Sequence, residues 1–257
     1  MMIKFFDWNL YFNLFILFIY GFIIGSFLNV MICRLPRGES IVLPPSHCPH
    51  CQHRLMGWDL VPLLSFLCLR GKCRYCGIKI NWRYPLVEFL TGALTLVWWL
   101  NIGQNGISIQ SIVFLILSYA LLVIAMIDID HHIIPDKITL PLIIAGLVYQ
   151  IAIGNFIAGL LGLIMGGGLL LVVSLFYSRG MGLGDVKLLA MVGTFVGWQQ
   201  VIGVLFLGST IGVVVMIPVM VTQKMNRKTP FAFGPFLVLA TLIVIYRWNF
   251  LLSCLPF

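Results

Sequence analysis

Charged side chains are scarce in this sequence: only 9% of its residues are charged, and 61% are hydrophobic. A soluble domain has about 25% charged residues, and no soluble core has room for so large an apolar share. The composition therefore excludes a soluble globular protein. We predict an all-α fold in which a lipid bilayer surrounds most of the chain and the apolar segments span it as helices.

The sequence also lacks a signal-peptide cleavage site and internal repeats, and both absences bear on how the chain is organised. The first apolar run, roughly residues 10–32, has no small-residue cleavage site and is longer than the apolar region of a signal peptide, so we predict a retained first membrane helix. No internal repeat or low-complexity tract is evident. The three glycines at 166–168 lie in a long apolar stretch and indicate close packing between helices.

The apolar runs predict eight membrane spans of about 20 residues each. They cover roughly residues 10–32, 85–102, 108–127, 138–153, 155–177, 187–198, 200–222 and 233–252. The sixth span is the shortest. The segment Trp198-Gln199-Gln200 that follows it is compatible with a tight turn between two spans or with a polar break inside one long span.

Basic residues predict the orientation of these spans. If segment 34–84 is cytoplasmic and the spans alternate, fourteen of the sixteen Lys and Arg residues face the cytoplasm, and only Lys4 and Arg247 lie outside. Membrane proteins accumulate basic residues on the cytoplasmic side, so this distribution favours eight spans with both termini outside. If the sixth and seventh spans were one span, the basic loop 224–228 would lie outside, against this rule, so the charges favour eight spans over seven. A net charge of +8 could indicate nucleic-acid binding, but the same rule already explains it. We therefore expect no nucleic-acid partner.

Segment 34–84 differs from the rest of the chain, because it holds eight of the sixteen basic residues and two Cys-x-x-C pairs. The pairs are Cys48 with Cys51 and Cys73 with Cys76, separated by 21 residues. This spacing is typical of a structural zinc site with four thiolate ligands and no open position. Disulfides rarely persist in the cytosol. Redox cysteines or plain packing are the alternatives, and one of the nearby histidines could replace a thiolate.

The other three cysteines, Cys33, Cys68 and Cys254, are predicted to be small buried hydrophobic residues.

Carboxylates become rare after the first third of the chain, where only four remain: Asp128, Asp130, Asp136 and Asp185. Three of them lie in the motif DIDHHIIPD at 128–136, and the fourth ends the motif GLGD at 182–185. Two predicted spans fit between Asp128 and Asp185, so the chain crosses the bilayer and returns to the same face. We expect the two carboxylates to meet there at equal depth.

Such a pair predicts aspartic-protease chemistry. An ionisable group near hydrocarbon is costly and indicates function. Two neighbouring carboxylates share one proton, so the ionised one can take a proton from water while the protonated one polarises a peptide carbonyl. We predict Asp128 and Asp185 as this pair. Gly182 and Gly184 would let a substrate backbone approach closely.

Simpler roles remain open for these side chains. Asp136 and Asp185 could cap helix N-termini, which favour negative charge. Asp130 is predicted to be supporting or solvated, since it would face away from Asp128 on a helix. His131 and His132 could assist proton transfer or be solvated interface residues.

Two other functions also remain open at this point. One is a transporter with proton-coupled aspartates. The other is a membrane-anchored zinc module that binds a partner through its basic segment.

The ordered motifs of the chain resemble those of the type IV prepilin leader peptidases, a family of bifunctional enzymes that also N-methylate the new N-terminus. The resemblance runs nearly from end to end and rests on GSFLNV at 25–30, RLP at 34–36, SIV at 40–42, PSHC at 45–48, the four cysteines, WRYPLVE at 82–88, the two aspartate motifs and FGPF at 233–236.

The resemblance implies a polytopic membrane protein of about eight helices, with a first helix at 1–33, a cytoplasmic zinc-binding insert at 34–84 and a peptidase core at 85–257. It implies a catalytic pair with supporting residues, namely Asp128 and Asp185 with Gly182, Gly184, Asp130, Pro135 and Asp136. The location would be the bacterial inner membrane, with the active site facing the cytoplasm.

The resemblance also implies substrates and a second activity. The substrates would be prepilins or pseudopilins, whose basic leader ends in glycine before an apolar helix. The methyl donor would be S-adenosylmethionine, with Gly71 as a candidate residue for its binding. Methyl transfer rests on the resemblance alone, since the sequence has no glycine-rich nucleotide loop after a strand.

Overall fold

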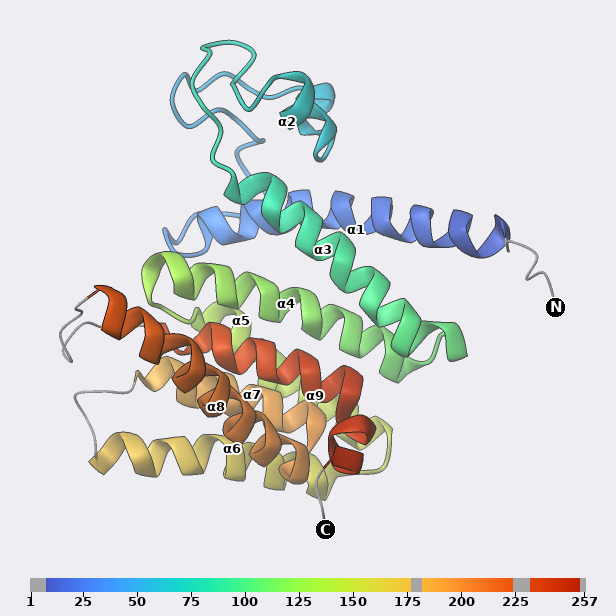
Figure 1. Cartoon of the computed structure of the whole chain (residues 1–257), viewed down its shortest axis with the longest axis vertical. Helices are drawn as coiled ribbons and strands as arrows, with labels where there is room; N and C mark the ends of the chain where they lie inside the picture. Colours follow the sequence, from blue (N-terminus) through green and yellow to red (C-terminus); the bar gives the residue numbers. More distant parts are fainter. Residues whose placement is uncertain (1–7, 177–181, 224–231, 255–257) are drawn as a thin grey trace. The chain divides into compact units, whose positions relative to one another are not determined.

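The computed structural model describes residues 8–176, 182–223 and 232–254. Helices dominate these ranges, which contain no strand and only two isolated β-bridges, so the all-α prediction is confirmed. The chain divides into two compact units, Met1–Tyr119 and Ala120–Phe257, whose helices are labelled in Figure 1.

In the first unit, the long helices α1 (Trp8–Arg34) and α3 (Arg83–Asn101) pack closely against each other. Small residues make this possible: a Cβ added to Gly21 would lie 2.6 Å from the Cα of Gly92. Four residues further along α1, a Cβ added to Gly25 would lie 2.7 Å from the Cα of Glu88. This is the small-xxx-small pattern by which membrane helices approach one another.

The segment between α1 and α3 has little regular structure. It contains a 3₁₀ turn, η1 (Gly57–Leu60), and the short helix α2 (Leu64–Cys68), which is labelled in Figure 1 among the loops beyond the start of α3. The carboxylate of Glu88 on α3 accepts the backbone N–H of Leu63 at 2.8 Å. This hydrogen bond attaches the insert to α3, the helix that follows it.

The remaining elements of the first unit lead into α4 (Ile109–His131), and the boundary between the units falls within this helix. A 3₁₀ turn, η2 (Gly103–Asn105), precedes α4. The indole N–H of Trp98 donates to the carbonyl of Ser111 at 2.6 Å, and the hydroxyls of Thr95 and Tyr119 lie 2.8 Å apart. These polar contacts satisfy groups that are buried between helices.

The second unit contains five further helices: α5 (Asp136–Ala152), α6 (Phe156–Phe176), α7 (Leu183–Val196), α8 (Trp198–Gln223) and α9 (Gly234–Cys254). The short helix α7 is its centre, because it packs against the other four. Leu188, Leu189 and Met191 are completely buried. A helix that other helices surround buries most of its surface, and residues 188–195 of α7 are all buried.

Glycines let α6 lie directly against α7. A Cβ on Gly166 would lie 2.5 Å from the carbonyl oxygen of Leu189, and one on Gly167 would lie 3.0 Å from the Cβ of Ala190. The predicted packing role of the glycine run is therefore confirmed for these two residues. It is wrong for Gly168, where an added Cβ would meet nothing within 4 Å.

All eight predicted spans correspond to helices, and the separation of the sixth from the seventh is confirmed. Gly197 adopts φ +83°, a left-handed conformation that ends α7, and α8 begins at the next residue. Four helices are long and apolar enough to cross a membrane, at Tyr11–Arg34, Ile109–His131, Phe156–Phe176 and Trp198–Pro218. The chain is thus an integral membrane protein, and the count of eight spans stays a prediction. Lys4, Arg179 and the basic loop 224–228, which entered the topology argument, lie outside the described residues.

Candidate active site and metal centre

The second unit holds an open pocket of about 400 Å³ that both predicted catalytic aspartates line. Asp128 comes from the last turn of α4, and Asp185 comes from the first turn of α7. The remaining lining residues come from the same two motifs and the positions beside them: His132, Ile133, Ile134, Asp136, Gly182, Gly184 and Lys187. The expectation that the chain brings these two motifs together is therefore met.

The side chain of Asp128 is held by a distant backbone group. Asp128 is buried, with 5% of its surface exposed, and its Oδ2 accepts the N–H of Gly234 at 3.0 Å. Gly234 is the first residue of α9. The helix that closes the chain therefore supplies a donor to this carboxylate.

Asp185 occupies a different environment. It is half-buried in the first turn of α7, and its own N–H donates to the carbonyl of Gly182 at 3.2 Å. Gly182 is the N-cap residue, and the described residues provide no side-chain cap to this helix, so the alternative that Asp185 is a capping residue is wrong. Its carboxylate is free to face the pocket.

Gly184, which lies directly before Asp185 in the sequence, is needed for packing. A Cβ added to Gly184 would lie 3.1 Å from the Cβ of Ile134, which belongs to the first aspartate motif. Gly184 thus lets the two aspartate motifs approach each other closely. An approach of a substrate backbone at this position stays a prediction.

Asp136 lines the pocket, and Pro135 precedes it at the start of α5. Pro135 is the N-cap residue of α5, and its carbonyl accepts the N–H of Ile138 at 3.0 Å. Asp136 was expected to be a cap and is not one, since the α5 cap has no side-chain hydrogen bond. Its carboxylate instead accepts two hydrogen bonds from the Lys187 ammonium, at 2.8 and 2.9 Å. This exposed ion pair joins α5 to α7.

The other polar residues of the first motif differ in position. Asp130 and His131 are exposed and do not line the pocket. His132 does line it, and this residue adopts a left-handed backbone with φ 54°. Its N–H donates to the carbonyl of Asp128 at 2.9 Å, and α4 ends at the preceding residue, His131.

The four paired cysteines of the first unit lie together, with all four Sγ atoms within 4.8 Å of one another. The Sγ atoms of Cys48 and Cys76 are 3.9 Å apart. Four sulfurs around a tetrahedral zinc, at about 2.3 Å each, would be separated by about 3.8 Å. The thiols are free of disulfides, and their arrangement suits a metal ion.

Both cysteine pairs sit on turns of the same design. The N–H of Cys48 donates to the carbonyl of His53 at 3.0 Å, and the N–H of Cys73 donates to that of Ile78 at 2.8 Å. Four residues after each first cysteine, Gln52 and Gly77 adopt left-handed conformations with φ 57° and 71°. We call these turns the two knuckles. Each knuckle presents its two thiols toward the other.

Electrostatics differ between the thiols. Burial opposes ionisation of Cys48, but the backbone N–H groups of Cys51 and His50 outweigh it and lower the pKa of this thiol to about 7. The Ile78 N–H favours ionisation of Cys76, but burial and the neighbouring thiols outweigh it and raise its pKa to about 11. Four thiolates so close together need a cation to compensate their charge.

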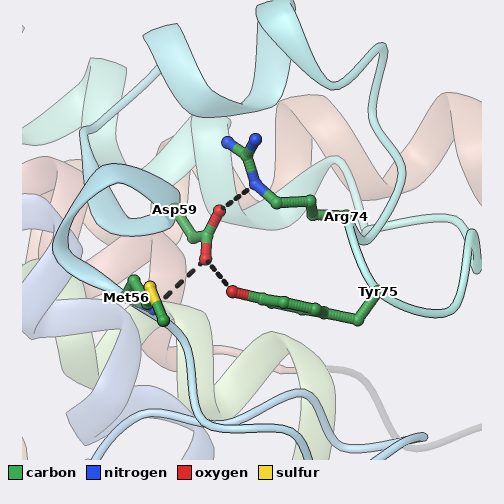
Figure 2. Close-up of polar contacts among 4 residues, drawn as sticks. All are labelled: Met56, Asp59, Arg74 and Tyr75. Carbon is green, nitrogen blue, oxygen red and sulfur yellow. Dashed lines mark hydrogen bonds and ion pairs between the residues drawn. The ribbon is translucent and has the colours of Figure 1, made fainter.

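A buried carboxylate supports the second knuckle (Figure 2). Asp59 has only 4% of its side chain exposed, and its two oxygens accept hydrogen bonds from Arg74 Nε at 2.7 Å and from Tyr75 Oη at 3.1 Å. The N–H of Met56 donates to the same group at 3.1 Å. The hydrogen bond from Arg74, followed by that from Met56, lowers the pKa of Asp59 against the opposing effect of burial.

The Asp59 bracket, defined as Met56, Asp59, Arg74 and Tyr75, thus ties the chain between the knuckles to the second knuckle. The ring of Tyr75 also stacks on His53, with centroids 3.7 Å apart, and His53 belongs to the first knuckle. The bracket and this ring contact connect the two knuckles and so hold their two pairs of thiols close to each other. An open pocket of about 430 Å³ adjoins the bracket.

Gly71, the candidate for methyl-donor binding, has a conformational reason to be glycine. It adopts φ +68°, and a Cβ there would lie 3.0 Å from the ring of Phe66. Its part in binding a methyl donor stays a prediction. Among the remaining cysteines, Cys33 is half-buried, and Cys68 is exposed, so the prediction of burial is wrong for Cys68. The side chain of Cys254 lies outside the described residues.

Two family models match the chain. The model described as the bacterial peptidase A24 N-terminal domain matches residues 19–102, and the model described as the type IV leader peptidase family matches residues 115–217. A prepilin leader peptidase/N-methyltransferase of Stutzerimonas stutzeri is 37% identical over 86% of this chain and 86% of its own length. The protein of the same name from Aeromonas hydrophila is 35% identical over 94% of this chain and 96% of its own length.

The chain belongs to the type IV leader peptidase family. No solved structure matches it with significance. In this member of the type IV leader peptidase family, the segment matched by the family's own model contains both Asp128 and Asp185. The segment matched by the N-terminal domain model contains all four paired cysteines.

Sequence reasoning did not find three of the contacts that build these sites. Gly234 was noted only as part of the FGPF motif at 233–236, and its donation to Asp128 was not foreseen. Lys187 was counted only as a basic residue of the topology. Asp59 had no assigned role, although an acidic residue between two cysteine pairs in a basic segment was a usable signal.

Proposed function

We propose that this protein removes the basic leader from type IV prepilins or pseudopilins and that Asp128 and Asp185 are its catalytic residues. The observation that supports the proposal most directly is that both aspartates line one pocket, although they are 57 positions apart in the sequence. Family membership supplies the reaction class. The substrates follow from the names of the relatives.

The chemistry of the proposed pair is hydrolysis by shared protonation. One carboxylate takes a proton from a water molecule, whose oxygen attacks the carbonyl carbon of the scissile peptide. The other carboxylate gives a proton to the carbonyl oxygen. When the C–N bond breaks, the leaving amine takes up the first proton, and the second carboxylate recovers a proton from a hydroxyl of the tetrahedral intermediate as the carbonyl re-forms, so the pair returns to its starting state. In this proposal the substrate lies in the open pocket beside Asp185, next to Gly182 and Gly184, which line it.

The orientation of the protein and its domain organisation are part of the same proposal. We place the 34–84 insert and the pocket on the cytoplasmic side of the inner membrane, with 1–33 as the first membrane helix and 85–257 as the peptidase core. The clustering of eight of the sixteen basic residues in the insert supports this orientation. A basic leader that remains on the cytoplasmic side would then reach the pocket without crossing the bilayer.

We further propose that the four cysteines bind a structural zinc ion and that the protein N-methylates the residue exposed by cleavage. The spacing of the four Sγ atoms supports the zinc ion. The names of the relatives support the methyl transfer. S-adenosylmethionine would supply the methyl group to the new amine, and Gly71 remains the candidate residue for binding it.

A mass-shift assay tests the proposal. The purified protein in detergent is mixed with a prepilin and S-adenosylmethionine, and intact masses are followed for the wild type, Asp128→Asn and Asp185→Asn. We expect loss of the leader mass and gain of one methyl group in the wild type only. Full cleavage by either variant would remove that aspartate from the active site. Cleavage without any methyl gain would refute the second activity alone.

A further inference from the structure

The contact between Gly234 and Asp128 distinguishes the two carboxylates of the pocket. Gly234 begins α9, and its N–H donates to Asp128 Oδ2 in a buried hydrogen bond of 3.0 Å. The first N–H groups of a helix have no acceptor within the helix, and the partial positive charge at this end attracts an anion. Asp128 serves as that acceptor, 106 positions away in the sequence.

The first turn of α9 leaves this donor to Asp128 alone. Pro235 has no N–H, and the N–H groups of Phe236 and Leu237 both donate to the carbonyl of Phe233, at 3.1 and 3.3 Å. Gly234 is therefore the member of this turn whose N–H points to the carboxylate. The arrangement accounts for every backbone donor in the turn.

Glycine is required at this position because the carboxylate is so close. A Cβ on Gly234 would lie 2.5 Å from Asp128 Oδ2 and 3.2 Å from its Cγ. The next atom is the Cδ1 of Ile134, at an ordinary 3.5 Å. A Cβ at position 234 would therefore collide with the Asp128 carboxylate and, among the described residues, with no other group.

Asp185 has no comparable donor among the described residues. It is half-buried, and the backbone hydrogen bond of its own N–H ends at Gly182. A carboxylate that accepts an N–H bond is favoured in its ionised form, whereas one without such a donor lacks this stabilisation of its charge. The two aspartates of the pocket therefore differ in which state their surroundings stabilise.

We propose that Gly234 is a positioning residue that makes Asp128 the ionised base and leaves Asp185 as the protonated acid. Asp128 takes a proton from the attacking water, and Asp185 gives its proton to the carbonyl oxygen as the C–O bond forms. On collapse, Asp185 recovers a proton from the tetrahedral hydroxyl, the C–N bond breaks, and the amine takes the proton held by Asp128. This assignment rests on the proposed peptidase function.

The other charged and titratable groups of the pocket are few. His132 follows α4, Asp136 begins α5, and Lys187 lies on α7 and is paired with Asp136. None of these groups removes the difference between the two aspartates, because the N–H of Gly234 reaches only Asp128. Variants at position 234 therefore test the assignment without changing any side-chain charge.

The sharpest test replaces the amide of residue 234 with an ester, so that glycolic acid stands in place of Gly234 and the N–H is lost without adding a side chain. We expect the acidic limb of the pH profile of kcat/KM to move up by about one pH unit, since the ionised base has lost its donor. A merely structural role would lower kcat without moving this limb. An unmoved limb in an active ester variant would overturn the proposal.

A steric variant gives the second arm. Gly234→Ala should lower kcat at least about 100-fold, because its Cβ displaces the base from its position. The matched control is Gly168→Ala, where an added Cβ meets nothing within 4 Å, and its cleavage rate should equal the wild type. Wild-type cleavage by Gly234→Ala would overturn the proposal. If Gly234→Ala unfolds, the ester variant still decides.

A comparison of the two Asn variants separates this inference from the proposed function. An amide at position 185 can still donate a hydrogen bond to the carbonyl oxygen, whereas an amide at position 128 cannot take a proton from water. Asp185→Asn should therefore retain about ten times more residual cleavage than Asp128→Asn. Equal or reversed residual rates would overturn the role assignment alone, and full activity in both variants would overturn the peptidase itself.

Discussion

The four thiols of the insert come from two knuckles of the same design separated by 21 residues, whereas the aspartate pocket draws on α4, α7 and α9. Each knuckle is closed by hydrogen bonds between residues no more than five positions apart. The pocket depends instead on a bond between residues 106 positions apart. The comparison teaches that the metal centre is a local structure, while the proposed active site exists only when the second unit is folded.

The largest effect should come from the two aspartates, without any effect on the insert. We expect Asp128→Asn and Asp185→Asn to lower the rate of leader cleavage by about 100-fold or more, because proton transfer is lost. Metal content, measured by elemental analysis, should equal the wild type. The matched control is Asp130→Asn, an exposed carboxylate two residues away, which should keep cleavage within about 10-fold of the wild type. Loss of metal from either active-site variant would show that the two regions are not independent.

The reverse experiment removes thiols. Cys48→Ser and Cys73→Ser should reduce bound zinc from about one ion per chain to nearly none, because a closed tetrahedral site needs all four ligands. The insert should then be cut rapidly in limited proteolysis, while leader cleavage continues, since the residues described as lining the aspartate pocket belong to the second unit. Cys68→Ser, an exposed cysteine outside the set, is the control. Equal loss of zinc from that control would contradict the assigned ligands.

A smaller effect is expected from Asp59, which is not itself a predicted metal ligand and acts through Arg74 and Tyr75 of the second knuckle. Asp59→Asn should weaken zinc affinity by about 10- to 100-fold, as is usual for residues that orient ligands. Competition with a chelator of known affinity measures the change. Glu39→Gln, an exposed acid in the same insert, should leave the affinity unchanged. An unchanged affinity in Asp59→Asn would mean that the knuckles hold their register without the bracket.

The pH dependence of this bracket follows from the direction of the Asp59 pKa. Because the hydrogen bond from Arg74 holds this pKa below its ordinary value, the contribution of Asp59 is complete above that ordinary value and is lost only as the pH falls through the lower, folded one. The ratio of zinc affinities between wild type and Asp59→Asn should therefore be constant between about pH 6 and pH 8. A ratio that shrinks within this window would indicate that another group titrates in the bracket.

The smallest effect should come from the ion pair at the rim of the pocket. Lys187 and Asp136 are 40% and 53% exposed, so water screens their attraction. Lys187→Met should cost about 1 kcal/mol or less in thermal stability, and the loss should vanish in high salt. Lys137→Met, an exposed neighbour of Asp136, is the control. A larger loss that persists in salt would mean that the pair orders the pocket.

The success of prediction from the sequence follows the same division between local and distant structure. The cysteine spacing was enough to predict the cluster, because each knuckle is made by neighbouring residues. The helices were predictable from hydropathy, and the left-handed Gly197 confirms the turn between the sixth and seventh segments. The meeting of Asp128 and Asp185 was predictable from the number of spans between them.

What could not be predicted depends on packing. The position of Gly234 against Asp128 requires the register of α9 against α4, and no local pattern in the sequence specifies that register. The pairing of Asp136 with Lys187 likewise needs the packing of α5 on α7. Both aspartates that were considered as helix caps have other partners or surroundings, because the cap positions are occupied by Pro135 and Gly182.

The close contact of α1 with α3 determines how well the protein can tolerate changes in the insert between them. The amide of Asn29 near the end of α1 donates to the carbonyl of Tyr84 near the start of α3 at 3.0 Å, so the two ends of the insert leave from adjacent points. A segment whose ends already meet can be lengthened, shortened or exchanged at little entropic cost. The insert can therefore change in length or sequence while the contact between α1 and α3 is kept.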